Sequence, residues 1–474
     1  MYVAGYPLGF KYWRPTSLEE ALSLLRELDG EVKPLAGGQS LMALLKLRLV
    51  KADHLVDIFH IDELKYIKWE GGALRIGALA THNVVAMSKA VVEAAPLLSE
   101  AAWHIADLQV RNLGTIGGSL AHADPAANYL PALAAAKAVV AIRGPGGTRE
   151  VPADAFYKGP YAPDLSKGEL VVEASVRPWF NASGFYAVKL GGAAYPSAVA
   201  AFVARLEDGV VAESRAAIGA VYASPQVIEG LGVGMKAEDL ARGAKALAER
   251  AVKEIAEPPI PDAHAPAEYK ARLAAAALAR AVEGAFSRRR LPARDGVEPL
   301  RGAGPVDSAD GRVKVKLTVN GVLYEDWVEP RTLLLDYLRS KGVGEVRRGC
   351  DEGKCGACTV LMDGRAVKSC MITAAQASGR SITTMRGLMR GGELHPIQRA
   401  FVEEYALQCG WCTHGFMAAV HDYLTNIDGD ADDETLRLSV RNICRCTGYV
   451  QIIKAIKKAA ERMRGGPAAV LFRQ

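Results

Sequence analysis

Cysteine is absent from the first 349 residues of this 474-residue chain, and all eight cysteines lie between Cys350 and Cys446. This crowding disfavours a disulfide framework, which belongs to small secreted domains. The chain lacks an uncharged apolar run of the roughly 18 residues that span a bilayer, and its start lacks the basic and apolar stretches of a signal peptide. We therefore expect a cytoplasmic protein without an integral membrane segment.

A strong excess of one charge is also missing. The formal net charge of +5 is small for this length and disfavours a nucleic-acid surface. The run Arg288-Arg289-Arg290 has no interleaved aromatic residues, so we interpret it as a solvated helix end. No Gly-x-Gly-x-x-Gly motif stands at a strand–helix junction and no Walker motif occurs, which excludes Rossmann and P-loop nucleotide binding. Because no nucleophile with its base and no paired acids are recognisable, we predict no catalytic residue.

The eight cysteines form two groups of four. The first group has the spacing Cys-x4-Cys-x2-Cys with a fourth cysteine after eleven residues, and the second has Cys-x2-Cys followed by Cys-x-Cys. One [2Fe–2S] cluster takes four thiolates, and the x4–x2 spacing is typical of plant-type ferredoxins. Zinc remains an alternative, although these spacings fit it poorly. The predicted metal ligands are Cys350, Cys355, Cys358 and Cys370 for one cluster, and Cys409, Cys412, Cys444 and Cys446 for the other.

Two double-glycine segments stand out in the first half of the chain. The first carries Gly37-Gly38 between an expected strand and an expected helix, which would direct backbone N–H groups at a phosphate. The second carries Gly117-Gly118 and is predicted to be a loop over residues 111–120. Each alone is often only a turn, but two such turns can hold a pyrophosphate from both sides. We expect a side chain at Gly37 or Gly117 to block this approach or to strain a positive φ.

Local patterns predict several further elements. Ser17 and Glu20 form a capping-box motif, residues 97–108 are amphipathic, and Thr332 is the expected N-cap of a later helix. Beyond residue 391 all the predicted elements are helices. Turn dipeptides predict hairpins at Gly71-Gly72, Asp208-Gly209 and Asn320-Gly321.

The cysteine and glycine segments together resemble the molybdenum hydroxylases, the family of xanthine dehydrogenase, aldehyde oxidase and aerobic carbon monoxide dehydrogenase. Residues 312–465 resemble the iron–sulfur subunit and residues 8–288 the FAD-binding subunit. The resemblance implies an α+β multidomain fold. Its parts would be an FAD-binding domain (1–177), an α+β C-terminal flavoprotein domain (178–290), a linker (291–311), a β-grasp ferredoxin-like [2Fe–2S] domain (312–388) and a four-helix-type [2Fe–2S] bundle (389–474).

The resemblance also implies cofactor-binding residues. Asn128 stands where relatives often carry an aspartate that faces the cofactor, although a solvent-exposed helix residue is the alternative. Tyr195 matches an aromatic residue beside the flavin ring, although a tyrosine without cofactor contact is the alternative, and Lys189 begins a shortened loop that leads to it. Gln408 matches a glutamine that bonds the pterin, and His414 replaces a usual proline. The FAD diphosphate and ribose would be bound by Ala36, Gly37, Gly38, Gln39, Ser40, Thr115, Ile116, Gly117, Gly118 and Ser119.

By resemblance, the chain would be an electron-transfer subunit that carries FAD and two [2Fe–2S] clusters. Its partner would be a large subunit with the molybdopterin cofactor, in a dimer of heterodimers, and electrons would pass from molybdenum through both clusters to FAD and an external acceptor of unknown identity. The alternative is a standalone flavin and iron–sulfur carrier, for which one cluster would suffice. Relatives that fuse these modules generally place the iron–sulfur region first, whereas here the flavin region comes first.

Overall fold

The computed structural model describes residues 5–190, 195–287, 292–427 and 433–465. The run Arg288-Arg289-Arg290 lies outside these residues. The chain divides into two compact units, each built from segments that are distant in sequence. Unit 1 comprises Met1–His60, Asp107–Leu113 and Leu300–Gln474, and unit 2 comprises Ile61–Ala106 and Gly114–Pro299. The predicted sequential domain boundaries stay a prediction.

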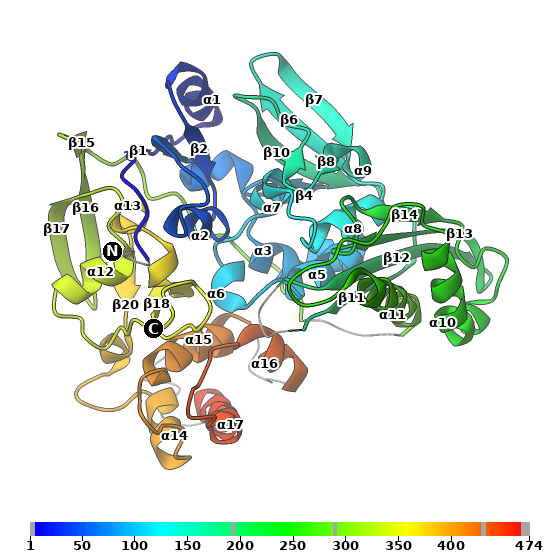
Figure 1. The fold of residues 1–474 in the computed structure, drawn as a ribbon. Helices are drawn as coiled ribbons and strands as arrows, with labels where there is room; N and C mark the ends of the chain where they lie inside the picture. Colours follow the sequence, from blue (N-terminus) through cyan, green and yellow to red (C-terminus); the bar gives the residue numbers. More distant parts are fainter. Residues whose placement is uncertain (1–4, 191–194, 288–291, 428–432, 466–474) are drawn as a thin grey trace. The chain divides into compact units, whose positions relative to one another are not determined.

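Unit 1 begins with a small parallel sheet and two helices (Figure 1). The Ser17 Oγ accepts the N–H of Glu20, as predicted, but the Glu20 carboxylate accepts from Thr16 and not from Ser17. The strands follow the order β1-β3-β2, with the bounds β1 Lys11–Trp13, β2 Val32–Leu35 and β3 His54–Asp57, and the helices are α1 Leu18–Glu27 and α2 Leu41–Lys46.

The first cysteine group belongs to a mixed sheet around helix α12 (Leu334–Ser340). The N-cap of α12 is Leu333, so the prediction of Thr332 as the cap is wrong by one position. Alternate residues of β16 are buried, as the period of two predicts. The strand order is β15-β16-β20-β18-β19, with β17 paired to β16; the bounds are β15 Ser308–Ala309, β16 Arg312–Val319, β17 Val322–Val328, β18 Thr359–Met362, β19 Arg365–Lys368 and β20 Ser381–Thr383.

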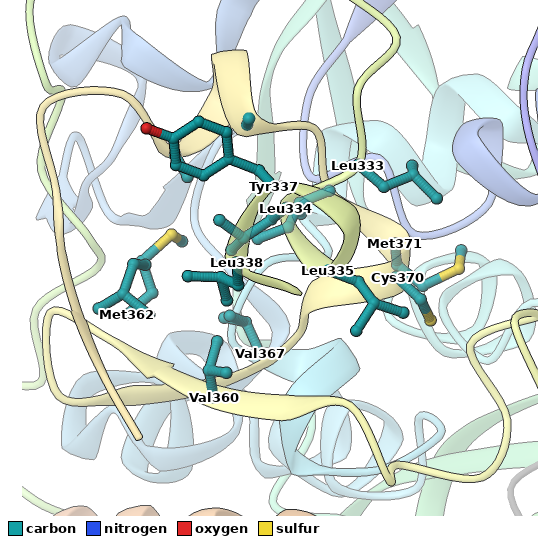
Figure 2. Close-up of a cluster of buried hydrophobic side chains, with 14 of the residues drawn as sticks. Leu333, Leu334, Leu335, Tyr337, Leu338, Val360, Met362, Val367, Cys370 and Met371 are labelled. Carbon is teal, nitrogen blue, oxygen red and sulfur yellow. The ribbon is translucent and has the colours of Figure 1, made fainter. Parts of the chain in front are cut away.

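Figure 2 shows the core of this part of unit 1, where the leucines of α12 pack against Val360 and Val367. Cys370 lies in the same core and is 2% exposed. The segment expected to be a linker joins this core from Leu300 onward, since Leu300 is 9% exposed and belongs to the same cluster. The Ala303 N–H also donates to the ring of His60 at 2.9 Å.

The last part of unit 1 is helical, as predicted. Helices α14 and α17 pack on each other, and α15 also packs against β18 and β19 of the sheet. The second cysteine group therefore lies at helix ends next to the sheet that carries the first group. The helices of this part are α14 Pro396–Glu403, α15 Thr413–Asn426, α16 Asp433–Ser439 and α17 Tyr449–Gly465, whereas α13 Ala374–Ala377 precedes β20 and packs against β16 and α12.

Unit 2 contains two larger antiparallel sheets and a two-stranded one, β8 Tyr157–Gly159 with β9 Ala162–Pro163. The first has the order β4-β5-β10-β6-β7, and the second, β11-β12-β13-β14, packs against α11 with α10 beside it. The bounds are β4 Ile67–Glu70, β5 Ala73–Gly77, β6 Val139–Gly144, β7 Gly147–Pro152, β10 Leu170–Val176, β11 Ala182–Val188, β12 Ala198–Glu207, β13 Val210–Gly219, β14 Gln226–Glu229, α10 Ala237–Lys253 and α11 Ala267–Ala285. The three predicted hairpin turns are confirmed, two of them in this unit.

One helix prediction is confirmed only in part, and one loop prediction is wrong. The helix expected over residues 97–108 is α5, Pro96–Trp103, and a separate short helix α6, Leu108–Arg111, begins after the cap Asp107. The second glycine segment is not a loop: it forms the first turn of helix α7, Ile116–His122. The remaining helices near these segments are α3 His82–Met87, α4 Lys89–Ala94 and α8 Tyr129–Ala135. None of the described helices is long and apolar enough to cross a membrane.

Candidate functional site

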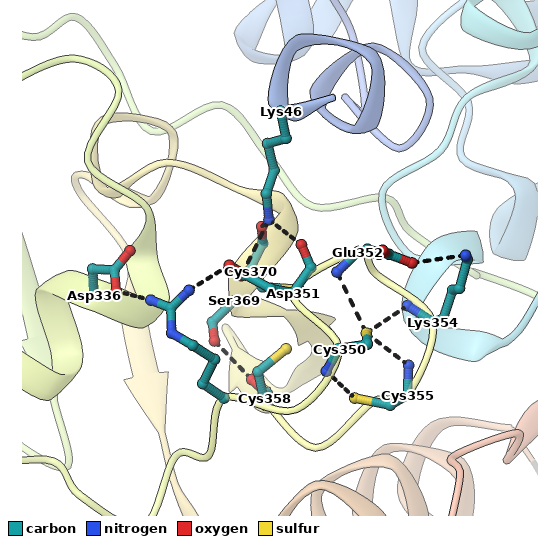
Figure 3. Close-up of polar contacts among 11 residues, drawn as sticks. Lys46, Asp336, Cys350, Asp351, Glu352, Lys354, Cys355, Cys358, Ser369 and Cys370 are labelled. Carbon is teal, nitrogen blue, oxygen red and sulfur yellow. Dashed lines mark hydrogen bonds and ion pairs between the residues drawn. The ribbon is translucent and has the colours of Figure 1, made fainter. Parts of the chain in front are cut away.

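The loop of the first cysteine group wraps its backbone around the thiols (Figure 3). The Sγ of Cys350 accepts the N–H groups of Glu352, Lys354 and Cys355 at 3.4, 3.3 and 3.2 Å. The N–H of Cys350 in turn donates to the Sγ of Cys355 at 3.3 Å. Such N–H to sulfur bonds stabilise thiolate charge, and they tune iron–sulfur clusters.

The four thiols of this group converge in two pairs. The Cys355 thiol donates to Cys350, which lowers the pKa of Cys350 to about 5 and raises that of Cys355. Likewise Cys370 donates to Cys358, which lowers the pKa of Cys358 and raises that of Cys370. Electrostatic interaction also joins Cys355 to Cys358 and Cys350 to Cys370, so all four predicted ligands face one another.

The second group converges in the same way at the ends of three helices. All four thiols line one pocket together with Gln408, Gly448 and Ile452. The Trp411 N–H and the Cys446 thiol lower the pKa of Cys409. Burial, followed by the nearby Cys444, raises the pKa of Cys412 to about 12. The thiols are therefore paired as Cys409 with Cys446 and Cys412 with Cys444.

Paired thiols fit a two-iron cluster better than a single zinc ion. In the described ranges, no three His, Cys, Asp or Glu side chains come close enough to hold one metal ion. A [2Fe–2S] cluster needs two thiolates at each iron, which is the pairing seen in both groups. His414 is buried, neither ring nitrogen makes a hydrogen bond within the described chain, and burial lowers its pKa to about 4.

The two cysteine groups meet at a contact between backbones. The Ile443 N–H, next to Cys444, donates to the carbonyl of Cys355 at 3.0 Å, and the Asn442 side chain donates to the Gly356 carbonyl at 3.0 Å. A Cβ on Gly415 would meet the backbone of Gly356 and would lie 2.9 Å from the Ala357 Cα. Gly356 has φ +73°, and a Cβ there would lie 2.7 Å from the Asn442 Cγ. Glycine at both positions thus lets the two cysteine-bearing segments touch.

The first glycine segment keeps the donors that phosphate binding requires. Gly38 has φ +70° at the turn between β2 and α2, and the Gln39 side chain donates to the Gly37 carbonyl at 2.8 Å. Within the described residues, the N–H groups of Gly37, Gly38 and Gln39 donate to no protein atom. Three consecutive free N–H groups before a helix form a concave site suited to an anion.

The second glycine segment has used its donors. The N–H groups of Ile116 and Gly117 donate to the carbonyls of Ala80 and Ala78 at 3.1 and 2.8 Å, and that of Gly118 donates to the Thr115 hydroxyl at 3.0 Å. The φ of Gly117 is not positive, and a Cβ there would lie 2.8 Å from the Ala78 carbonyl oxygen. The expectation of positive-φ strain is therefore wrong for Gly117, which allows close packing, and also for Gly37, since the positive φ of the first segment lies at Gly38.

The structure places the remaining predicted residues individually. Asn128 is 4% exposed and its amide donates to the Ala101 carbonyl at 3.0 Å, so the alternative of an exposed helix residue is wrong. The Lys189 ammonium donates to the His104 carbonyl at 2.6 Å, and Tyr195 is 52% exposed. The exposed Gln408 donates to the Cys446 carbonyl at 3.3 Å. Ala194, which precedes Tyr195, lies outside the described residues. A cofactor role for Asn128, Lys189, Tyr195 and Gln408 stays a prediction.

Sequence reasoning missed several polar residues of the flavin-resembling half that contact the cysteine-bearing segments within unit 1. Lys46 donates to the Asp351 carbonyl in the first cysteine loop, and Asp107 accepts from Lys368. The Gln109 amide donates to Asn442 at 2.8 Å and to Thr359 at 3.3 Å, and the Asn112 amide donates to Asp422 at 2.6 Å. No local motif marks these residues, since their partners lie more than 200 positions away.

Known families match both halves of the chain. Residues 8–178 match the FAD binding domain in molybdopterin dehydrogenase, residues 317–381 a 2Fe-2S iron-sulfur cluster binding domain, and residues 384–457 a [2Fe-2S] binding domain.

Individual relatives cover the two halves separately. The carbon monoxide dehydrogenase medium chain of Hydrogenophaga pseudoflava is 37% identical over 60% of this chain and 99% of its own length. The 6-hydroxypseudooxynicotine dehydrogenase complex subunit beta of Paenarthrobacter nicotinovorans is 44% identical over 30% of this chain and 90% of its own length. In the structure of quinoline 2-oxidoreductase from Pseudomonas putida 86, a chain matches with a TM-score of 0.55 and 32% identity, over 59% of this chain and 97% of that chain.

Proposed function

Since the chain belongs to the molybdenum hydroxylase family, as a fusion of its FAD-binding and [2Fe–2S] electron-transfer subunits, we propose that it carries electrons from a molybdenum centre on a separate large subunit to an external acceptor. The observation that carries this proposal is the convergence of two complete sets of four thiols in one compact unit with a glycine turn whose N–H groups are free. When bound, the two clusters would carry single electrons and FAD would exchange electrons singly or in pairs.

The residues of the chain have distinct roles in this proposal. The eight cysteines hold the clusters, and the N–H groups around Cys350 stabilise thiolate charge. We place the FAD diphosphate at the free N–H groups of Gly37, Gly38 and Gln39, with Ala36 and Ser40 completing the turn. The FAD-binding role of Thr115, Ile116, Gly117, Gly118 and Ser119 rests on the family resemblance alone, because their leading N–H groups are used within the segment and its neighbours.

Electrons would enter at the second cysteine group and leave at the flavin. Cys409 is exposed, and Gln408 lies beside it at the pocket of the group. Exposed apolar side chains flank this group in the chain: Tyr405 is 82% exposed, Trp411 50% and Ile443 51%. Such a group of exposed apolar residues is typical of a protein interface. These features favour a large molybdopterin-binding subunit as partner over a standalone carrier.

We further propose a cytoplasmic complex organised as a dimer of heterodimers. The names of these relatives refer to carbon monoxide, a diatomic gas, and to 6-hydroxypseudooxynicotine and quinoline, which are nitrogen heteroaromatic compounds. We therefore assign substrate choice to the partner subunit and not to this chain.

Co-purification tests the proposal. The tagged chain, expressed in its native host, should bring down a larger chain and about one molybdenum per chain, and native mass should show two copies of each. In this complex, Cys409→Ser should abolish flavin reduction by the organic substrate while FAD remains bound and reducible from the acceptor side. Recovery of the flavin and iron chain without molybdenum would support the standalone carrier instead. Flavin reduction at the normal rate in Cys409→Ser would refute the order of centres.

A further inference from the structure

A buried lysine from the flavin-resembling half reaches the first cysteine loop. Lys46 is the last residue of α2, and its side chain is 3% exposed. Its ammonium donates to the carbonyls of Asp351 and Cys370 at 2.6 and 2.9 Å, and it lies 3.3 Å from the Asp351 carboxylate (Figure 3). Asp351 follows the predicted ligand Cys350, and Cys370 is itself a predicted ligand. A positive charge therefore lies against the backbone of the cluster site.

A buried aspartate from the same half acts on the other side of this loop. The Asp107 carboxylate lies 2.5 Å from the ammonium of Lys368, and both side chains are 2% exposed. Lys368 also donates to the carbonyl of Gly353, in the middle of the cysteine loop, at 2.6 Å. Asp107 thus offsets a second positive charge that touches the loop.

The other charges at this loop are already paired within the iron–sulfur half. Arg348 pairs with Asp336 and Asp351, and the exposed Lys354 pairs with Glu352. Water and salt screen the exposed pair, whereas charges that are nearly fully buried keep most of their field. Lys46 and Asp107 are therefore two described residues through which the flavin-resembling half changes the charge balance of the loop.

We propose that Lys46 and Asp107 set the reduction potential of the first cluster, Lys46 raising it and Asp107 lowering it. The inference rests on the proposed function, because it requires a cluster at the first cysteine group. Reduction adds one electron, and hence one negative charge, and it breaks no bond. A fixed positive charge nearby stabilises the reduced form, and a fixed negative charge opposes it. Through these residues the flavin-binding half would set the reduction potential of the first cluster, which passes electrons to the flavin.

Redox titration of the full-length protein, followed by electron paramagnetic resonance with dithionite as reductant, tests this proposal. The signal that is lost in Cys358→Ser identifies the first cluster. At the wild-type midpoint potential of this cluster, Lys46→Met should lower the ratio of reduced to oxidised cluster about tenfold, a shift of about 59 mV for a one-electron couple. Asp107→Asn, which keeps the helix cap and the shape of the side chain, should shift the midpoint in the opposite direction. The midpoint of the second cluster should not change in either variant.

Lys314→Met is the matched control, because it removes a lysine of the same module whose side chain is 35% exposed and paired with Glu325. It should leave both midpoints unchanged. Unchanged first-cluster midpoints in both Lys46→Met and Asp107→Asn would overturn the inference, and so would shifts of the same sign, which would indicate distortion in place of charge. Because Asp107→Asn is nearly isosteric, it decides the question even if Lys46→Met fails to fold. A wild-type protein without the first-cluster signal would overturn the proposed function instead.

Discussion

Gly415→Ala should separate the two cysteine-bearing segments. Gly415 lies in the first turns of α15, just after Cys412, and an added Cβ would meet the Gly356 carbonyl at a distance that real Cβ atoms do not show. It would also lie 2.9 and 3.0 Å from the Cα and carbonyl carbon of Ala357. These atoms are backbone on both sides, and Gly356 is also confined by Asn442. No side chain can therefore move to relieve the clash.

The magnitude follows from two opposing terms. Replacing glycine with alanine inside a helix gains about 1 kcal/mol from propensity. Overpacking a well-packed site costs about 1–3 kcal/mol and occasionally more, and rigid backbone on both sides places this site at the upper end. We expect a net loss of about 2 kcal/mol. The visible absorption of the clusters during chemical denaturation should report it, since the substitution lies between the two cluster sites.

Two other Gly→Ala substitutions provide the controls. Gly344→Ala lies in the same unit, with no atom within 4 Å of the added Cβ, and should be nearly neutral. Gly243→Ala lies within α10, with its nearest contact 3.8 Å away, and should stabilise its helix by up to about 1 kcal/mol. If Gly415→Ala and Gly344→Ala lost their cluster absorption at the same denaturant concentration, the close backbone contact between the two cysteine segments would be refuted.

Three further predictions address cofactors and pH. The purified chain should contain about four iron and one FAD, and zinc in place of iron by metal analysis would refute the cluster assignment. Gly38→Ala should lower the FAD content, measured after acid release. Gly72→Ala should leave it unchanged, although both glycines have positive φ and the two substitutions cause similar backbone strain. Equal FAD content in the two variants would refute the phosphate site at the first glycine turn. Burial lowers the pKa of His421 to about 4, whereas a histidine in the unfolded chain has a pKa of about 6.5. Between these values the unfolded chain binds more protons, so the free energy of unfolding falls as the pH falls through this window. His421→Asn should therefore reduce the loss of stability between pH 7.5 and 5.5 in urea denaturation, and an unchanged loss would contradict this.

Elements with local signals were predictable. The hairpin turns at Gly71-Gly72, Asp208-Gly209 and Asn320-Gly321 form as predicted, because such turns depend only on neighbouring residues. The two cysteine groups were also predictable, because the spacing of the ligands reflects the chemistry of the cluster. The structure brings the four thiols of each group together. The first glycine segment also has the predicted strand–turn–helix context.

The failures have one physical cause, which is that tertiary contacts decide between equal local patterns. A double glycine can form a phosphate-binding turn or allow close packing, and Gly117 packs on Ala78, 39 positions earlier. The N-cap of α12 is Leu333 in place of Thr332, because Leu333 belongs to the buried core of the sheet. Lys46, Lys368 and Asp107 gave no local signal, because their buried ion pairs form with partners that are remote in sequence.

These long-range contacts explain why a flavin-first order is compatible with the fold. Within unit 1, the segments Met1–His60 and Asp107–Leu113 are joined to the iron–sulfur half by two buried ion pairs, Lys46 with Asp351 and Lys368 with Asp107. Breaking one buried pair by removing a partner costs about 3–5 kcal/mol, because the remaining charge stays in the interior. Separation of the segments would break both pairs at once and would leave their charges without partners. The contacts and not the order of the modules therefore hold the segments together, and a chain that connects them from either end can form the same unit.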